Sequence, residues 1–197
     1  MDFSLRSIFE LARFSVLSPR AAARRLMDMN LPNNARWILF CLSVIASALA
    51  SYAGFQLLPP DAQVFWESAM SRPLQNVVIQ AAFWLLTVLG LHRLGRWGAR
   101  QGSFADTLLL VSWWQIVFFG LQAAQILALL IVPIIGDLMG LVSLVLVLWL
   151  LTQFVIELHG FQYFWRVLPG VIGAFLLAGM ALILILAVLV FVFTGRV

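Results

Sequence analysis

Five long apolar stretches determine what this chain can fold into. Each contains about twenty residues with almost no charged side chain, and a helix of that length crosses the hydrocarbon core of a bilayer, which is about 30 Å thick. The stretches cover residues 37–57, 74–91, 107–132, 138–158 and 168–193. Hydrophobic residues make up 63% of the 197 positions, more than one soluble domain can bury. The sequence therefore predicts an all-α, polytopic bundle of five transmembrane helices.

Residues 1–35 form the shorter of two predicted units, an amphipathic and basic segment that precedes the five-helix transmembrane domain of residues 36–197. Ser18 followed by Pro19 suits a helix N-cap and first helical position, so two short helices are expected. Each has an apolar face and an arginine-bearing face, as interfacial helices do. The apolar faces contain Leu5, Ile8, Phe9 and Ala12 in the first helix and Ala22, Ala23, Leu26 and Met27 in the second.

The arginines of this segment leave two interpretations open. They bind the anionic headgroups of the inner leaflet, at about 1 kcal/mol per charge, or the segment docks on the protein's own cytoplasmic face. A nucleic-acid partner is not expected despite the net charge of +4, because the arginines flank the spans and do not form a basic surface interleaved with aromatic residues. The lipid bilayer, and through it other membrane proteins, are the expected partners.

The distribution of arginine predicts the orientation, because positively charged loops stay in the cytoplasm. Ten arginines fall on one side of the predicted membrane and two on the other. The ten are Arg6, Arg13, Arg20, Arg24, Arg25, Arg36, Arg93, Arg96, Arg100 and Arg166, and the two are Arg72 and Arg196. We therefore expect a cytoplasmic N-terminus and a periplasmic C-terminus in a bacterial cytoplasmic membrane.

Small residues repeat at four-residue spacing in the first span and in the fifth. Helices associate in membranes by close packing of such residues, because lipid tails give no hydrophobic force between helices. The rows are Ser43, Ser47 and Ser51, then Ala46, Ala50 and Gly54, and in the fifth span Gly170, Ala174 and Ala178. The two rows in the first span predict that it is the most surrounded helix of the bundle.

Glutamines within or near the spans leave a second choice open. Gln115 and Gln122 are seven residues apart and share a helical face, Gln125 lies in the same span, and Gln153 lies in the fourth span. They line a polar path in a permease, or they form hydrogen bonds between helices, at about 0.6 kcal/mol each. No ionisable residue lies near the middle of any span, although transport pathways usually contain one.

Charged and histidine residues gather at the ends of the spans. Ser103 and Asp106 have the spacing of a capping box at the entry to the third span. Glu157 is expected to pair with an arginine of the loop after the second span, or with His159. His92, His159 and one carboxylate lack a metal-ligand spacing motif, and Cys41 is the single cysteine. No catalytic, cofactor-binding or metal-ligating residue is therefore expected, and no cofactor.

Three sequence segments combine into one further pattern: SPRAAARRLMDMNLP at 18–32, RQGSFADTLLLVSWWQ at 100–115 and ELHGFQYFWRVLPGV at 157–171. Together they resemble the bacterial branch of the YIP1 (Yip1-domain) family of five-span membrane proteins. The resemblance implies Rab GTPase binding only for eukaryotic members, whose long N-terminal domain and D-L-x-G-P-type motif are missing here. The expected function is a non-enzymatic membrane scaffold, adaptor or membrane-organising protein, and the alternative is a small-solute or ion permease.

Overall fold

The computed structural model describes residues 5–57, 63, 72–98 and 101–194, and these residues are helical with no strand among them. Two short helices, α1 (Leu5–Leu17) and α2 (Pro19–Asp28), precede the long ones. The long helices are α3 (Asn33–Gln56), α5 (Pro73–Leu94), α6 (Phe104–Ile131), α7 (Pro133–His159) and α8 (Phe164–Thr194), with a 3₁₀ turn η1 (Gly95–Trp97) after α5. All five long helices are long and apolar enough to cross a membrane, which confirms the predicted all-α bundle.

Each predicted span coincides with one long helix, and the helices extend past the apolar stretches because local caps mark their true ends. The Ser103 side chain caps the start of α6, and Pro73 and Pro133 occupy the first turns of α5 and α7. At the end of α7, Gly160 adopts the left-handed conformation with φ of 68°, and the Phe161 N–H donates to the Ile156 carbonyl. Glycine is required there because a Cβ disfavours positive φ.

Residues outside the description include several that the sequence analysis used. Arg100 and Arg196 are among them, as is the side chain of Leu5.

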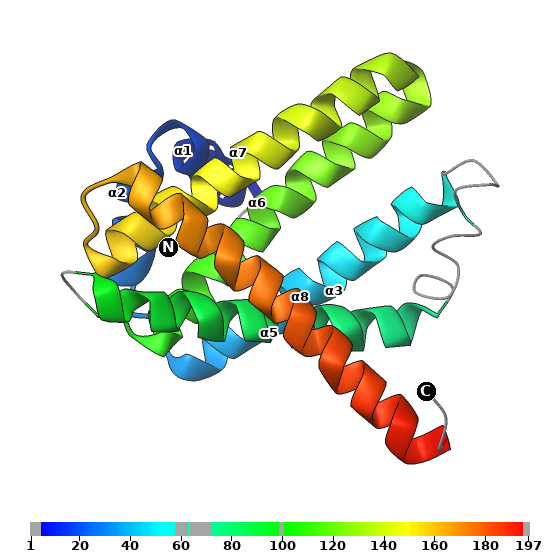
Figure 1. The fold of residues 1–197 in the computed structure, drawn as a ribbon. Helices are drawn as coiled ribbons and strands as arrows, with labels where there is room; N and C mark the ends of the chain where they lie inside the picture. The colour runs from blue at the N-terminus through cyan, green and yellow to red at the C-terminus, as the bar shows by residue number, and fades with distance from the viewer. Residues whose placement is uncertain (1–4, 58–62, 64–71, 99–100, 195–197) are drawn as a thin grey trace.

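The long helices alternate in direction, so the starts of α3, α6 and α8 lie at one end of the bundle with the ends of α5 and α7. We call this the platform end, because α1 and α2 lie there, and the opposite end the far end. α3 packs on α6 and α5, α6 on α7, and α5 on α8. Figure 1 shows the helices close together toward the platform end and spread apart at the far end, where the α6–α7 hairpin diverges from α3, α5 and α8.

The hydrophobic core lies in the half of the bundle near the platform end. Every residue of α6 from 107 to 115 is buried, and the core continues through Phe154 of α7 and Val171 of α8. Toward the far end the hairpin exposes large apolar side chains such as Ile131 and Leu141. Lipid tails cover such side chains in a bilayer, so the far half needs no protein neighbours on every face.

The prediction that the first span is the most surrounded helix holds for one face only. In α3 the small residues Ser43, Ser47 and Ala50 are buried, but Leu42 and Leu49 on the other face are exposed. The start of α6 is enclosed on all sides instead. Its central position follows from packing against both α3 and α7, which small-residue spacing within one span does not reveal.

Aromatic side chains mark the level of the membrane boundary at the platform end. Trp37, Trp97, Tyr163 and Trp165 are exposed there, and the Arg166 guanidinium lies 4.8 Å from the centre of the Tyr163 ring. Trp and Tyr favour the interface between lipid tails and headgroups, because their rings are apolar and their N–H or O–H groups are polar. The platform end therefore lies at this interface.

Candidate functional site

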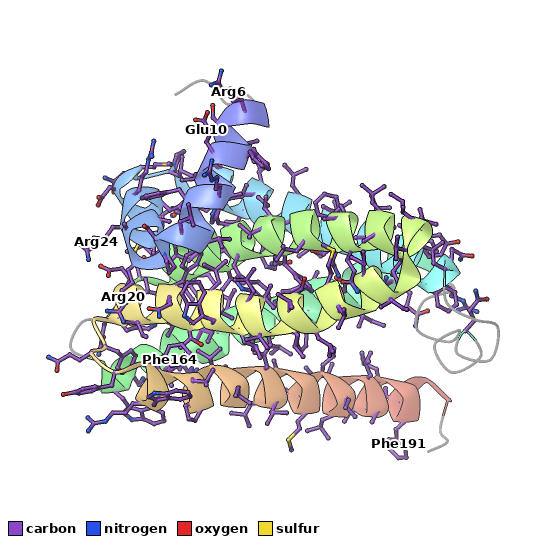
Figure 2. The ribbon with its side chains drawn as sticks, turned by 90° about the horizontal axis from the view of Figure 1, so that it is seen from above. Arg6, Glu10, Arg20, Arg24, Phe164 and Phe191 are labelled. Carbon is purple, nitrogen blue, oxygen red and sulfur yellow. The ribbon has the colours of Figure 1, made fainter. Side chains whose placement is uncertain are left out.

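The platform consists of α1 and α2 and docks on the bundle through an apolar face of α2. Ala22, Ala23 and Leu26 are buried against α7 and α6, as predicted for the apolar side of this helix. In α1 the structure corrects the prediction at one position: Ile8 and Ala12 pack on the core, but Phe9 is exposed. Figure 2 shows α1 directed away from the bundle, crosswise to the long helices, with Arg6 and Glu10 at its outer end.

Two arginines of α2 bind polar side chains of α7. The Arg24 Nε and Nη2 atoms donate to the two carboxylate oxygens of Glu157 at 2.8 and 3.3 Å, and the Arg20 Nε donates to the Gln153 Oε1 at 2.8 Å. Arg24 is a partner of Glu157 that the sequence prediction did not name. Residues 133 positions apart come together because α2 folds back onto the end of α7.

A second ion pair joins the starts of α3 and α6. The Arg36 Nη1 donates to the Asp106 Oδ1 at 2.6 Å, and the Arg36 Nε donates to the Leu31 carbonyl at 2.8 Å. Asp106 also accepts from the Ser103 hydroxyl, whose oxygen accepts from the Asp106 N–H, so the predicted cap is confirmed. The Arg36 side chain is only 9% exposed. Burial of the guanidinium requires this carboxylate, since an unpaired buried charge is costly.

His159 joins the end of α7 to the loop before α6 and to α5. Its Nδ1 accepts from the Gly102 N–H at 3.2 Å, and its Nε2 lies 3.0 Å from the Leu91 carbonyl oxygen. A carbonyl only accepts, so the ring is neutral with its proton on Nε2. Close packing of Gly95 and Gly98 around the fully buried ring leaves no space for a side chain at those two positions.

The end of α1 is tied to the middle of the core. The Trp113 indole N–H of α6 donates to the Ser15 hydroxyl at 2.9 Å, and both side chains are buried. The Ser15 hydroxyl in turn donates to the Leu11 carbonyl at 2.8 Å. This bond holds α1 at the level of Trp113, nine residues into α6, so α1 does not lie free of the bundle.

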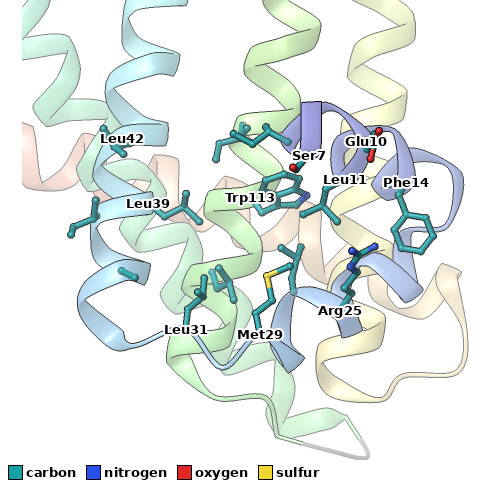
Figure 3. Close-up of a pocket in the computed structure, with 16 residues that line it drawn as sticks. Ser7, Glu10, Leu11, Phe14, Arg25, Met29, Leu31, Leu39, Leu42 and Trp113 are labelled. Carbon is teal, nitrogen blue, oxygen red and sulfur yellow. The ribbon is translucent and has the colours of Figure 1, made fainter. Parts of the chain in front are cut away.

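A cavity of about 690 Å³ lies between the platform and the helices α3 and α6. Most of its lining is apolar, and its polar side chains are Ser7 and Glu10 of α1 and Arg25 of α2. Figure 3 shows these residues on the platform side of the cavity, with Leu39 and Leu42 of α3 opposite and Trp113 between them. Sequence reasoning missed this cavity because its lining comes from four helices, and no segment contains a recognisable part of it.

The glutamines have different surroundings. Gln153 accepts from Arg20, and a Cβ added at Gly140 of α7 would lie 2.7 Å from the Gln125 Nε2, so Gln125 lies where α6 and α7 approach closely. Both amide atoms of Gln115 and the Oε1 of Gln122 are buried and have no hydrogen-bond partner among the described residues. Only Gln153 therefore supports the interhelical hydrogen bonding expected of this group.

The chemistry of the platform end is that of paired charges. Asp106 and Glu157 each bind an arginine, and His159 bonds to backbone groups. The described residues contain no group of three or more His, Cys, Asp or Glu side chains that could hold a metal ion. The His92 ring contacts Phe104 edge to face at 6.0 Å between ring centres. These arrangements join helices, whereas the cavity beside Arg25 is open to a ligand.

Comparison with known proteins gives one match that covers most of the chain. The family model described as the Yip1 domain matches residues 14–194, from the last turn of α1 to the end of α8. No curated protein and no solved structure matches the chain.

Proposed function

Because the chain belongs to the Yip1 domain family and is a multi-pass membrane protein, we propose that it acts as a non-enzymatic scaffold that organises anionic lipid at the cytoplasmic face of a bacterial inner membrane. The N-terminus and the platform lie on the cytoplasmic side in this proposal, and the C-terminus lies in the periplasm. Through this lipid layer and its lipid-facing helices, the protein also contacts other membrane proteins.

The observation that supports this proposal most is the platform itself. It keeps one face on the bundle and presents on the other a mixture of exposed basic and apolar side chains, which suits a leaflet of anionic lipid. In α1 the exposed side chains include Arg13, Phe9 and Leu17. Both interpretations of the N-terminal segment are therefore compatible: α2 docks on the protein, and the outer face of the platform meets the headgroups.

A non-enzymatic role is supported by the use of the ionisable groups. General acid–base or nucleophilic catalysis needs a reactive group directed into a space that a substrate can enter. Glu157 and Asp106 are engaged with arginines that hold helices together, and His159 is fully buried between backbone groups. These ionisable groups therefore stabilise the packing of the helices at the platform end.

The test measures lipid enrichment around the full-length protein in vesicles of phosphatidylcholine that contain a small fraction of fluorescent phosphatidylglycerol. Energy transfer from the protein's tryptophans should report enrichment of the anionic lipid, and enrichment should fall as salt screens the charges. The Arg13→Gln/Arg96→Gln variant, which removes two exposed arginines at the platform end, should reduce it about 30-fold, at about 1 kcal/mol per charge.

The matched control is Arg72→Gln, which removes one exposed arginine at the far end, before α5. With fluorescent phosphatidylglycerol confined to the leaflet at the platform end, this variant should behave like the parent protein. Enrichment that changes neither with salt concentration nor with removal of the platform-end arginines would refute lipid organisation by the platform.

A permease remains a second candidate because one observation favours it: the unpartnered amide of Gln115 in the buried part of α6. Proteoliposomes distinguish the two functions. Flux of a small solute or ion that Gln115→Leu abolishes would favour the permease. In a scaffold the same change should leave the free energy of unfolding unchanged or raise it, because it removes an unsatisfied polar group.

A further inference from the structure

The cavity between the platform and the bundle is open to lipid from the side. Ile38 and Leu42 of α3 line it, and both are about 60% exposed. Further inside, its lining includes Leu26 of α2, Leu39 of α3 and Leu109 of α6. A lipid tail in the leaflet beside α3 therefore meets a continuous apolar path that leads under α1 and α2.

The polar side of the cavity contains one guanidinium without an ion-pair partner among the described residues. Arg25 lines it and forms no hydrogen bond or ion pair within the described part of the chain. Glu10 lines it as well, but its Oε1 accepts from the Arg6 Nε at 3.0 Å. The Glu10 charge is thus balanced by Arg6, and the Arg25 charge is left for a ligand.

We propose that this cavity binds one anionic phospholipid of the surrounding leaflet, with an acyl chain among Leu26, Leu39 and Trp113 and the phosphate at Arg25. The volume of about 690 Å³ falls in the usual range of ligand sites, which is about 300–1,000 Å³. This inference rests on the proposed function. It adds one lipid bound in a defined cavity to the lipids that surface charge gathers around the platform.

An acyl chain fits this lining better than a protein segment does. A peptide backbone in the cavity needs hydrogen-bond partners for its N–H and C=O groups, because unsatisfied polar groups are costly away from water. The lining offers the side chains of only Ser7, Glu10 and Arg25, all on the platform side. A hydrocarbon chain needs no partner, and a single anionic headgroup matches the single uncompensated guanidinium.

The experiment uses the full-length protein in phosphatidylcholine nanodiscs that contain phosphatidylglycerol with a photoreactive diazirine in its acyl chain. After irradiation, mass spectrometry should locate adducts on cavity residues such as Leu39 and Trp113. Arg25→Gln should lower this labelling about fivefold, the effect of one basic residue near anionic lipid. Arg72→Gln is the control, since it removes an exposed arginine at the far end that does not line the cavity, and it should change the labelling less than twofold.

A second pair of variants tests the position of the acyl chain. Leu39→Trp fills the cavity and should reduce the labelling, whereas Leu49→Trp on the exposed face of the same helix should not. Equal losses for Arg25→Gln and Arg72→Gln, or equal labelling by phosphatidylcholine with the same diazirine, would refute the anionic site. Labelling that persists in Leu39→Trp would refute the proposed position of the acyl chain.

A third arm identifies the occupant directly and separates this inference from the proposed function. A benzophenone side chain introduced at Leu39 should form an adduct with phospholipid, and an adduct with a second copy of the protein would overturn the proposal. Salt-sensitive lipid enrichment without labelling of the cavity would refute the site and leave the scaffold function intact. Loss of both would refute the scaffold function as well.

Discussion

At the residue scale, His159 connects three segments of the platform end with one ring. The Gly102 N–H donates to Nδ1, Nε2 donates to the Leu91 carbonyl, and the ring itself belongs to the last turn of α7. The side chain is fully buried, so neither nitrogen can exchange its partner for water. An isolated histidine at the end of a span is therefore explained by two backbone groups that would otherwise be buried without partners.

Replacing this ring should weaken the platform end. We expect His159→Ala to lower the free energy of unfolding by about 2–4 kcal/mol, because it leaves two backbone groups unsatisfied and opens a cavity. Hydrogen exchange should show faster exchange of the Gly102 amide, which loses its acceptor. Unchanged protection of that amide would contradict the bond. Gly173→Ala, which meets open space in α8, is the neutral control.

The Asp106 carboxylate has two roles that substitutions can separate. Asp106→Ala removes the partner of the nearly buried Arg36 and should cost about 2–3 kcal/mol of unfolding free energy. Ser103→Ala removes the cap of α6 and should cost about 1 kcal/mol. Asp28→Ala, an exposed acid in the last turn of α2, should change the value by less than about 0.5 kcal/mol. Chemical unfolding in detergent measures all three, and a similar loss for each would refute the ion pair's importance.

At the element scale, small residues set how closely the helices approach. A Cβ added at Gly90 of α5 would lie 3.2 Å from the Ala174 Cβ of α8, so these two helices touch through the predicted row in α8. In α3 the serine row is polar as well as small, since Ser51 accepts from the Gln80 amide of α5 at 3.4 Å. The serine row of α3 and the row of α8 therefore face neighbouring helices, whereas a Cβ added at Gly54, the end of the second row of α3, would meet open space.

Two alanines of α3 test this division between faces. Ala50 is buried and Ala53 is exposed, so Ala50→Leu should cost about 1–3 kcal/mol by overpacking. Ala53→Leu adds the same atoms on the face that meets lipid and should be nearly neutral. Thermal unfolding in detergent compares them. Equal effects of the two substitutions would mean that α3 does not pack through its small-residue face.

At the scale of the whole molecule, the helices are tightly packed at the platform end and spread at the far end (Figure 1). The ion pairs Arg24–Glu157 and Arg36–Asp106 lie in the packed half, together with the His159 bonds. Exposed tryptophans lie at the same end. One end of the molecule is therefore fastened by polar contacts at the interface, and the other depends on lipid to cover its apolar side chains.

The orientation of the whole molecule is predicted by the arginine distribution. Five spans predict that the two termini lie on opposite sides, and ten arginines against two predict a cytoplasmic N-terminus. Alkaline phosphatase fused after Val197 should be active, because it folds in the periplasm, and a cytoplasmic reporter fused before Met1 should be active as well. An inactive phosphatase fusion would contradict the five-span orientation.

The sequence by itself determined the elements of this protein and most of their ends. Apolar length predicted five spans because backbone groups in lipid must be satisfied within a helix. Ser103 with Asp106, and Pro19 after Ser18, marked helix starts because their chemistry acts on the nearest turn. The small-residue rows predicted that α3 is the most surrounded helix, which holds for one of its faces only. These properties depend on residues that are close together in the sequence, so they can be predicted from the sequence.

Only the tertiary structure decided which elements meet and what lies between them. Arg24 binds Glu157 across 133 positions, and the segment enclosed on all sides is the start of α6. The cavity beside Arg25 needs the relative placement of α1, α2, α3 and α6. Lipid can cover an apolar face on any side of a helix, so hydropathy does not determine which helix faces pack against each other. The arrangement of the helices is determined by the shapes of their surfaces and by a few polar contacts, which form only when the helices have come together.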